Sequence, residues 1–184
     1  LSMASGDVRL TSLVQGSLTQ TGGSFDFAIQ GPGYFLIETA AGERLTRAGS
    51  FTPNGNGELV TPDGHRVLDS GGAPVFIPPD ARPINVAADG TLSADGRPLA
   101  QLGLVQPVNI NRLTRESGVL FAAPDGHEPA TDTVVVQGAV ESSNVDPIGQ
   151  IARMIEVQRA YEMGQNFLSA EDDRIRNAIK TFSR

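Results

Sequence analysis

The sequence predicts a mostly β protein, with an antiparallel β domain of short strands followed by one long C-terminal α-helix that carries a heptad seam. Three observations predict this fold class. The 184 residues include 21 glycines and 12 prolines without a collagen repeat, which is typical of a chain with many tight turns. Short apolar runs alternate with Asn-Gly and Asp-Gly pairs over residues 24–140. After Pro147 no further proline occurs, and apolar residues recur every seven positions.

The predicted strands of the β domain are short apolar runs. Phe25, Phe27 and Ile29 alternate with other residues, as in a half-buried strand, and residues 34–37 form a continuous apolar run. Later apolar runs lie at residues 75–77, 84–87, 102–105, 119–121 and 134–136.

Turn residues separate these runs. Six Asn-Gly or Asp-Gly pairs accept the positive φ of hairpin turns and lie at residues 54–55, 56–57, 63–64, 89–90, 95–96 and 125–126. Two of these pairs bracket residues 91–94, so that strand is very short. Prolines at residues 78, 79 and 83 mark an irregular connection. We therefore expect roughly eight to ten antiparallel strands.

A single long helix is predicted from Pro147 to Phe182. Asp146 is a good N-cap and precedes a proline at the first helical position. A helix of about 36 residues is roughly 54 Å long. A domain of about 140 residues has a radius of gyration of only about 14 Å. The β domain is therefore too small to cover the whole helix.

The apolar residues of this helix form the predicted heptad seam. One position of the seam recurs every seven residues and is occupied by Met154, Tyr161, Leu168, Ile175 and Phe182. The second position lies three residues later and is occupied by Val157, Gly164 and Ala178, with Glu171 as the exception. A strict seven-residue repeat is the pattern of a left-handed coiled coil. A long helix packed along its own β domain is the alternative. Since part of the seam needs another helix, we expect a partner from another subunit or from a missing N-terminal segment.

The sequence divides into three segments: an irregular lead-in over residues 1–23, the β domain over residues 24–140 and the helical segment over residues 141–184. The first residues have no initiator Met and lack the basic and apolar regions of a secretory signal. We therefore expect a fragment or a tagged chain, in which residues 1–5 need not be native. No apolar run is long enough to span a bilayer.

Composition and motifs disfavour several classes of function. A net charge of −7 without a basic cluster argues against binding to nucleic acid or to an anionic membrane. The absence of cysteine excludes a thiol nucleophile, a disulfide scaffold and a thiolate metal site. Neither a nucleophile elbow nor a phosphate-binding loop occurs. We expect no enzyme, no cofactor, no metal and no small-molecule substrate.

Two features keep a ligand hypothesis open. His65 and His127 each follow a Pro-Asp-Gly turn, where a metal pair or a general base is the alternative to exposed turn residues. Residues 54–58 read NGNGE, with oxygen atoms at alternate positions. A hairpin turn is favoured there over a calcium loop, because the distal glutamate of an EF-hand is missing.

Four blocks of the sequence carry distinctive motifs. Residues 21–35 read TGGSFDFAIQGPGYF, residues 46–51 TRAGSF, residues 137–145 QGAVESSNV and residues 158–162 QRAYE. In this order the blocks resemble the signatures of the bacterial flagellar rod and hook protein family. The residues that match the family motifs are Gly31, Gly33, Tyr34, Phe35, Arg47, Gly49, Phe51, Glu141, Ser143, Asn144, Val145, Gln158, Arg159 and Tyr161.

The resemblance implies a structural role. A member of this family is a subunit of the flagellar basal-body rod, which assembles helically into the axial drive shaft and transmits torque from the motor to the hook. Its partners are other rod subunits and the export apparatus, through which it reaches the periplasm without a cleaved signal peptide. In the family an N-terminal helix pairs with the C-terminal one, so we expect the seam to lack its native partner here.

The middle of the chain resembles the proximal-rod member best, because residues 118–121 lead directly into the closing motif block at residues 137–145. A distal-rod or hook-type axial subunit of the same family is the alternative. A secreted adhesin with a ligand-binding β domain and a periplasmic hydrolase are the two rival classes outside the family.

Overall fold

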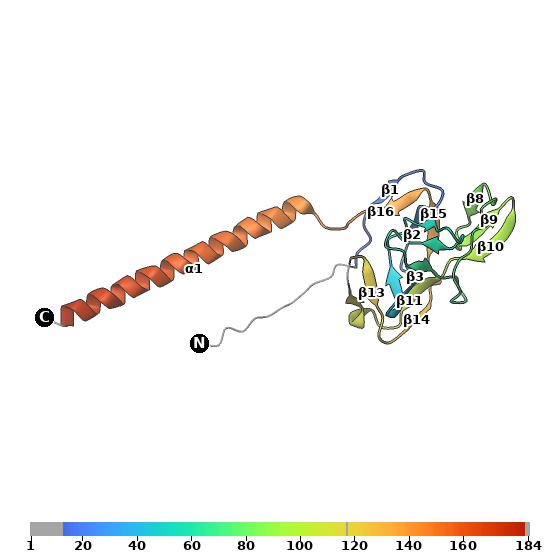
Figure 1. The fold of residues 1–184 in the computed structure, drawn as a ribbon. Coiled ribbons are helices and arrows are strands. Elements are labelled where there is room, and N and C mark those ends of the chain that lie inside the picture. Colours follow the sequence, from blue (N-terminus) through green and yellow to red (C-terminus); the bar gives the residue numbers. More distant parts are fainter. Residues whose placement is uncertain (1–12, 117, 183–184) are drawn as a thin grey trace. The chain divides into compact units, whose positions relative to one another are not determined.

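The computed structural model describes residues 13–116 and 118–182, which fall into two compact units (Figure 1). The β unit extends to Asn144, and the helical unit begins at Val145. The described residues contain sixteen strands, a short 3-10 helix (Ile110–Arg112) and one α-helix. The predicted fold class, antiparallel β strands plus one C-terminal helix, is confirmed. The predicted number of strands was too low, because many connections contain strands of only two or three residues.

The largest sheet has nine strands in the order β12-β13-β4-β3-β7-β6-β5, with β11 paired to β3 and β14 paired to β11. All of its ladders are antiparallel. Its strands are β3 (Tyr34–Thr39), β4 (Gly42–Thr46), β5 (Thr52–Pro53), β6 (Leu59–Val60), β7 (Arg66–Val67), β11 (Leu104–Pro107), β12 (Thr114–Arg115), β13 (Leu120–Ala122) and β14 (His127–Pro129).

Three smaller sheets complete the β unit. One sheet, at one end of the β unit in Figure 1, consists of β8 (Ile84–Val86), β9 (Thr91–Ala94) and β10 (Arg97–Gln101). The second pairs β2 (Phe27–Gln30) with β15 (Val134–Gln137), and the third pairs β1 (Leu18–Gln20) with β16 (Ala139–Glu141). Strand β1 lies within the stretch expected to be an irregular lead-in, whose first twelve residues lie outside the described part of the chain.

Strand β3 lies between two apolar clusters, which explains its continuous apolar run. Phe35 and Ile37 belong to the main core, whereas Tyr34 and Leu36 belong to a second, smaller cluster. Since side chains alternate between the faces of a strand, a strand buried on both faces needs an unbroken run of apolar residues. Strand β2 was predicted to be half-buried, but Ala28 is fully buried, as are Phe27 and Ile29, so both faces of this strand are covered.

Turn chemistry places the hairpin of β9 and β10 where the sequence predicts it. The connecting residues, Asp95 and Gly96, have φ values of 49° and 75°, the pair of positive values that a two-residue type I′ turn requires. Strand β9 is as short as predicted, with four residues. The predicted apolar run at residues 75–77, in contrast, forms no named strand and contributes one isolated bridge, between Phe76 and Glu58. The following residues 78–83 are irregular, as their prolines predict.

Helix α1 (Pro147–Phe182) is the whole regular structure of the helical unit, with the bounds that the sequence predicts. Asp146 caps its first turn, because its carboxylate oxygens accept the amides of Ile148 and Gly149 at 3.1 Å each. No described helix is both long and apolar enough to cross a membrane.

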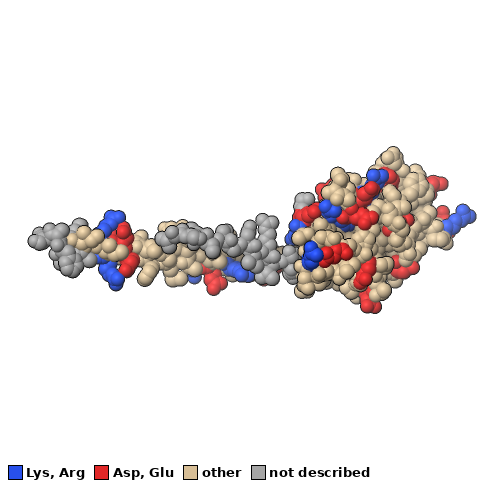
Figure 2. All heavy atoms as spheres, turned by 90° about the horizontal axis from the view of Figure 1, so that it is seen from below, with Lys and Arg blue, Asp and Glu red and all other residues tan. Residues whose placement is uncertain are grey.

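The two units differ in charge. Residues 1–144 contain eight basic and fifteen acidic residues, whereas residues 145–184 contain six of each, so the β unit carries all of the net charge of −7. Figure 2 shows acidic side chains spread over the visible face of the β unit.

Candidate functional site

The predicted seam lies on one exposed face of α1. Met154, Val157, Tyr161, Leu168 and Ile175 have exposed fractions between 51% and 68%. At 100° per residue their Cα–Cβ directions fall within an arc of roughly 60°. The side chains of Phe182 and Ala178 lie outside the described residues. In the helical unit by itself, these five apolar side chains are therefore grouped on one face and left in water.

A second apolar group on α1 escaped the sequence analysis. Ile148, Ile151 and Ile155 are 80%, 55% and 42% exposed, and they lie outside the arc of the seam. Their spacing of three and four residues was the signal that could have revealed them. Met163 and Phe167 are exposed as well. The first turns of α1 thus present a wider apolar surface than a simple heptad seam.

Two members of the seam pattern are not apolar contacts. Glu171, the exception in the repeat, forms an ion pair of 2.7 Å with Arg174 one turn later. Gly164 has open space around the position that a Cβ would occupy. Nothing within the described chain requires a glycine there, although glycine in a helix costs about 1 kcal/mol relative to alanine.

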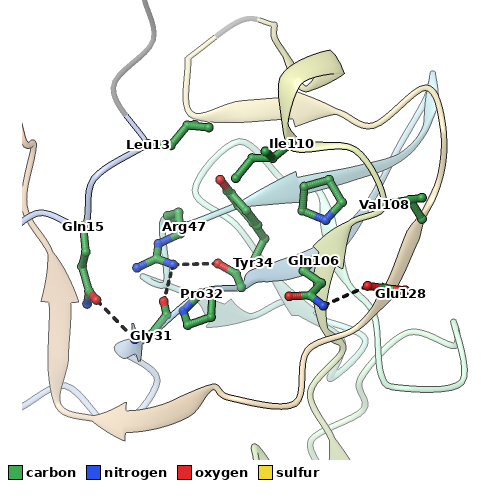
Figure 3. Close-up of a pocket in the computed structure, with 12 residues that line it drawn as sticks. Leu13, Gln15, Gly31, Pro32, Tyr34, Arg47, Gln106, Val108, Ile110 and Glu128 are labelled. Atoms are coloured by element: carbon green, nitrogen blue, oxygen red, sulfur yellow. Dashed lines mark hydrogen bonds between the residues drawn. The ribbon is translucent and has the colours of Figure 1, made fainter.

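In the β unit, the family-motif residues gather around Arg47. The Arg47 Nε donates to Glu141 Oε2 at 2.8 Å, and one terminal nitrogen donates to the carbonyls of Gly31 and Gly33 at 2.9 and 2.8 Å. The guanidinium also lies 5.8 Å from the centre of the Tyr34 ring. Figure 3 shows Arg47 directed at the turn that contains Gly31 and Pro32. Arg47 thus joins three segments that are distant in sequence.

Glu141 belongs to a pair of antiparallel segments, which we call the terminal pair (residues 14–22 and 138–144). Its centre is the ladder between β1 and β16. The Ser142 amide donates to the Ser17 carbonyl at 2.8 Å, and the Asn144 side chain donates to the Val14 carbonyl at 2.6 Å. A Cβ at Gly16 would lie 2.0 Å from the Ser142 carbonyl oxygen, so the two segments approach closely.

The remaining motif residues of the β unit are structural. Phe35 and Phe51 are buried, with ring centres 5.2 Å apart in an edge-on arrangement. A Cβ at Gly49 would lie 1.7 Å from the Phe27 carbonyl oxygen, which explains why glycine occupies that position. Ser143 lies within the terminal pair. In the helical unit, Val145 precedes α1, and Gln158 and Arg159 are exposed on it.

A hollow of about 450 Å³ lies beside the Arg47 cluster (Figure 3). The exposed side chains of Val108 and Ile110 form part of its wall. Several of its polar groups are bonded to one another: Gln106 donates to Glu128 at 2.9 Å, and Gln15 accepts the Gly31 amide at 3.2 Å. The hollow therefore does not display a nucleophile beside a base.

Tyr34 lies in the wall of the same hollow. Burial raises the pKa of the Tyr34 hydroxyl above its ordinary value near 10, against the opposing effect of the Arg47 charge, and the Glu141 charge raises it further. The phenol is thus neutral at physiological pH.

The features that kept a ligand hypothesis open lie in turns or have local partners. His127 Nε2 lies 3.1 Å from Glu43 Oε2, and His65 follows the turn at Gly64. The side-chain oxygen of Asn54 accepts the amides of Asn56 and Glu58, and the segment is the hairpin turn between β5 and β6. Among the described residues, no three or more His, Asp or Glu side chains are grouped so that they could hold a metal ion.

Comparison with known proteins identifies the family. The family model "Flagellar basal body rod FlgEFG protein C-terminal" matches residues 136–181, and "Flagellar hook protein FlgE/F/G D1 domain" matches residues 28–94. A Caulobacter vibrioides protein named "Flagellar basal-body rod protein FlgF" is 36% identical over 94% of this chain and 71% of its own length. The chain belongs to the flagellar basal-body rod protein family.

Further relatives agree with this assignment. The Mesorhizobium japonicum protein named "Flagellar basal-body rod protein FlgF" is 39% identical over 98% of this chain and 76% of its own length. The Bacillus subtilis protein named "Flagellar basal-body rod protein FlgG" is 33% identical over 89% of this chain and 67% of its own length. The two matched ranges include the residues of the Arg47 cluster and α1 up to residue 181.

Proposed function

We propose that this protein is a structural subunit of the flagellar basal-body rod, which assembles helically into the axial shaft that transmits torque from motor to hook. The observation that carries the proposal is the exposed apolar face of α1 in a member of the rod protein family. A helix with five large apolar side chains grouped on one side and in water is incomplete until another helix covers them.

The seam on α1 is the assembly surface in this proposal. Apolar residues spaced by seven pack as knobs into the holes of a neighbouring helix, and the resulting left-handed coiled coil is stiff along its axis. The partners are other axial subunits, of the same kind and of neighbouring kinds. Heterologous contacts that do not close into a ring generate a helical filament, which is the symmetry that a shaft needs.

The position along the rod and the route to it are further parts of the proposal. The relatives named FlgF that we describe are 36% and 39% identical to this chain, whereas the one named FlgG is 33% identical. This difference favours the proximal rod over the distal rod. In the proposal the subunit passes through the flagellar export apparatus without a cleaved signal peptide, and the rod that it joins lies in the periplasm. A rod subunit needs no catalysis, no nucleic acid and no small-molecule substrate.

Deletion of the gene tests the rod function. The proposal predicts that cells without it contain no complete rods in purified basal bodies and do not swim, and that the full-length gene restores both. Intact rods and normal swimming in the deletion strain would contradict the proposal, and the β unit would then be screened for ligands.

A further inference from the structure

Both chain connections of the β unit run through the terminal pair. Residues 14–22 lead into the β unit, and residues 138–144 lead out of it toward the helical unit. The two segments are bonded to each other by the β1–β16 ladder and by the contacts on either side of it. Any load that passes between the helical unit and the β unit along the chain therefore passes through the terminal pair.

Two residues of the β unit's body bond to this pair. Asp26 accepts the Thr21 hydroxyl through its carboxylate and the Gly138 amide through its carbonyl. Arg47, which follows β4, bonds to Glu141 in β16 and to the carbonyls of Gly31 and Gly33 in the turn before β3. Among the described residues, this is the one ion pair that joins the terminal pair to the rest of the β unit.

The geometry of this contact is that of a rigid clamp. The side chains of Arg47 and Glu141 are only 19% and 12% exposed, and both carboxylate oxygens of Glu141 are used. The second oxygen accepts the Gly16 amide at 2.9 Å, so the carboxylate contacts both segments of the terminal pair. The planar guanidinium bonds in several fixed directions at once, which a lysine ammonium does not reproduce.

Gln15 adds a second tie to the same place. Its amide nitrogen donates to the Ile29 carbonyl at 2.7 Å, and its oxygen accepts the Gly31 amide. Arg47 and Gln15 thus both bond to the backbone of residues 29–33.

We propose that the Arg47–Glu141 contact is the mechanical joint of the subunit, which fixes the terminal pair against the β unit so that load passes between the helical layer and the β layer of the rod. This inference rests on the proposed rod function. Without the contact, the β unit stays folded around its own core, but the terminal pair is held only by hydrogen bonds such as those of Gln15 and Asp26, and it opens more often.

Amide hydrogen exchange of the 184-residue chain tests the local part of the proposal. The variant Arg47→Met keeps the length of the side chain and removes its charge and donors. We expect the amides of Thr21 and Ser142, which bond within the terminal pair, to exchange on the order of tenfold faster than in the parent chain. The amides of Leu36 and Leu68, bonded in the core of the large sheet, keep their exchange rates.

The matched control is Arg66→Met, since Arg66 forms an exposed ion pair with Glu38 at 3.0 Å on the same unit. This control leaves all four exchange rates unchanged. Unchanged exchange rates at Thr21 and Ser142 in Arg47→Met would overturn the proposal. An equal acceleration at these two amides and at those of Leu36 and Leu68 would also overturn it. If Arg47→Met does not fold, Glu141→Gln takes its place with the same expected pattern and the same contrary outcomes.

Swimming under load tests the mechanical part. In a strain whose full-length gene carries Arg47→Met, we expect assembled rods but a loss of swimming speed in viscous medium that exceeds the loss in the Arg66→Met strain. Absence of rods with a folded subunit would overturn the proposal, because Arg47 would then serve an intersubunit contact. Failure of the unmutated gene to restore rods would instead contradict the rod function itself.

Discussion

The β unit buries its large apolar residues in a core, whereas helix α1 exposes them. In the β unit, Phe27, Ile29, Phe35 and Leu59 are completely buried in one core. On α1 every large apolar side chain that the structure describes is at least 42% exposed. The β unit is therefore stabilised by its own interior, whereas the helix has a regular backbone but no interior to join. A segment can therefore have regular secondary structure without burying the apolar side chains that it carries.

Charge follows the same division. The β unit carries the whole net charge, which favours solubility and disfavours contact between like copies, whereas the helical unit is neutral. A neutral helix with an exposed apolar face is the part of the chain suited to close packing in an assembly. We therefore expect substitutions on α1 to impair rod assembly and substitutions in the β core to lower the stability of the β unit.

The largest expected effect comes from a charge in the seam. Leu168→Asp places a carboxylate where apolar packing is proposed, so we expect the full-length variant to abolish rod assembly and swimming. The stability of the β unit stays within about 0.5 kcal/mol of the parent, since Leu168 is 68% exposed in the chain by itself. Electron microscopy of basal bodies and urea unfolding of the chain measure the two effects.

Ala170→Asp is the matched control for this substitution. It introduces the same charge two residues later, which is about 200° around the helix from Leu168. We expect rods to assemble in this strain. Normal motility of Leu168→Asp, or equal loss in both strains, would refute the assignment of the seam.

A substitution in the β core has the opposite signature. Phe35→Ala removes a fully buried ring that packs against Phe51, and we expect the free energy of unfolding to fall by about 3–5 kcal/mol. The helix content of residues 147–182 should not change. Urea unfolding followed by circular dichroism measures the loss, and Phe76→Ala, at a ring that is half exposed, is the control with little effect. Equal losses in both variants would show that the core is elsewhere.

A smaller effect is expected at Gly164. An alanine there meets no other atom within 4 Å in the chain by itself, so Gly164→Ala should stabilise α1 by up to about 1 kcal/mol. Far-ultraviolet circular dichroism of the isolated chain should show more helix. A decrease in helix content would mean that α1 already packs against something at this position in the isolated chain.

The smallest effect concerns pH. Because burial raises the pKa of Tyr34 above the value of an unfolded tyrosine near 10, the folded state holds this proton more tightly. Its contribution to stability is fully present below about pH 10 and is lost as the pH rises through the folded pKa. Tyr34→Phe should weaken this alkaline loss in urea unfolding at a series of pH values, whereas Tyr161→Phe, at an exposed ring, should not. An identical pH profile for Tyr34→Phe and the parent would contradict the burial of the phenol.

The features that sequence predicts well are those set by neighbouring residues. The cap at Asp146, the bounds of α1 and the turn at Asp95 and Gly96 follow from local backbone preferences, and the structure has all three. The pairing of β9 with β10 follows from the same turn. The family motif blocks single out Arg47 and Glu141 but do not indicate that the two are bonded.

The features that sequence missed depend on distant partners. Arg47 and Glu141 are separated by 94 positions, and nothing in either sequence block indicates that they are bonded. The pairing of β1 with β16 is equally non-local, so the lead-in offered no sign of a strand. Two-residue strands such as β7 carry too few residues for an alternating pattern, which is why the number of strands was underestimated. The second apolar group on α1, Ile148, Ile151 and Ile155, has a helical spacing in the sequence, but the longer heptad repeat is the stronger pattern.

The most direct test of the contrast between the two units is amide hydrogen exchange of the 184-residue chain in dilute solution. If α1 awaits a partner, the amides of residues 147–182 exchange fast, because a helix without tertiary packing is only marginally stable, while the amides of β3 and β4 exchange slowly. Strong protection along α1 in a dilute monomer would contradict the account, since the helix would then be complete without an assembly.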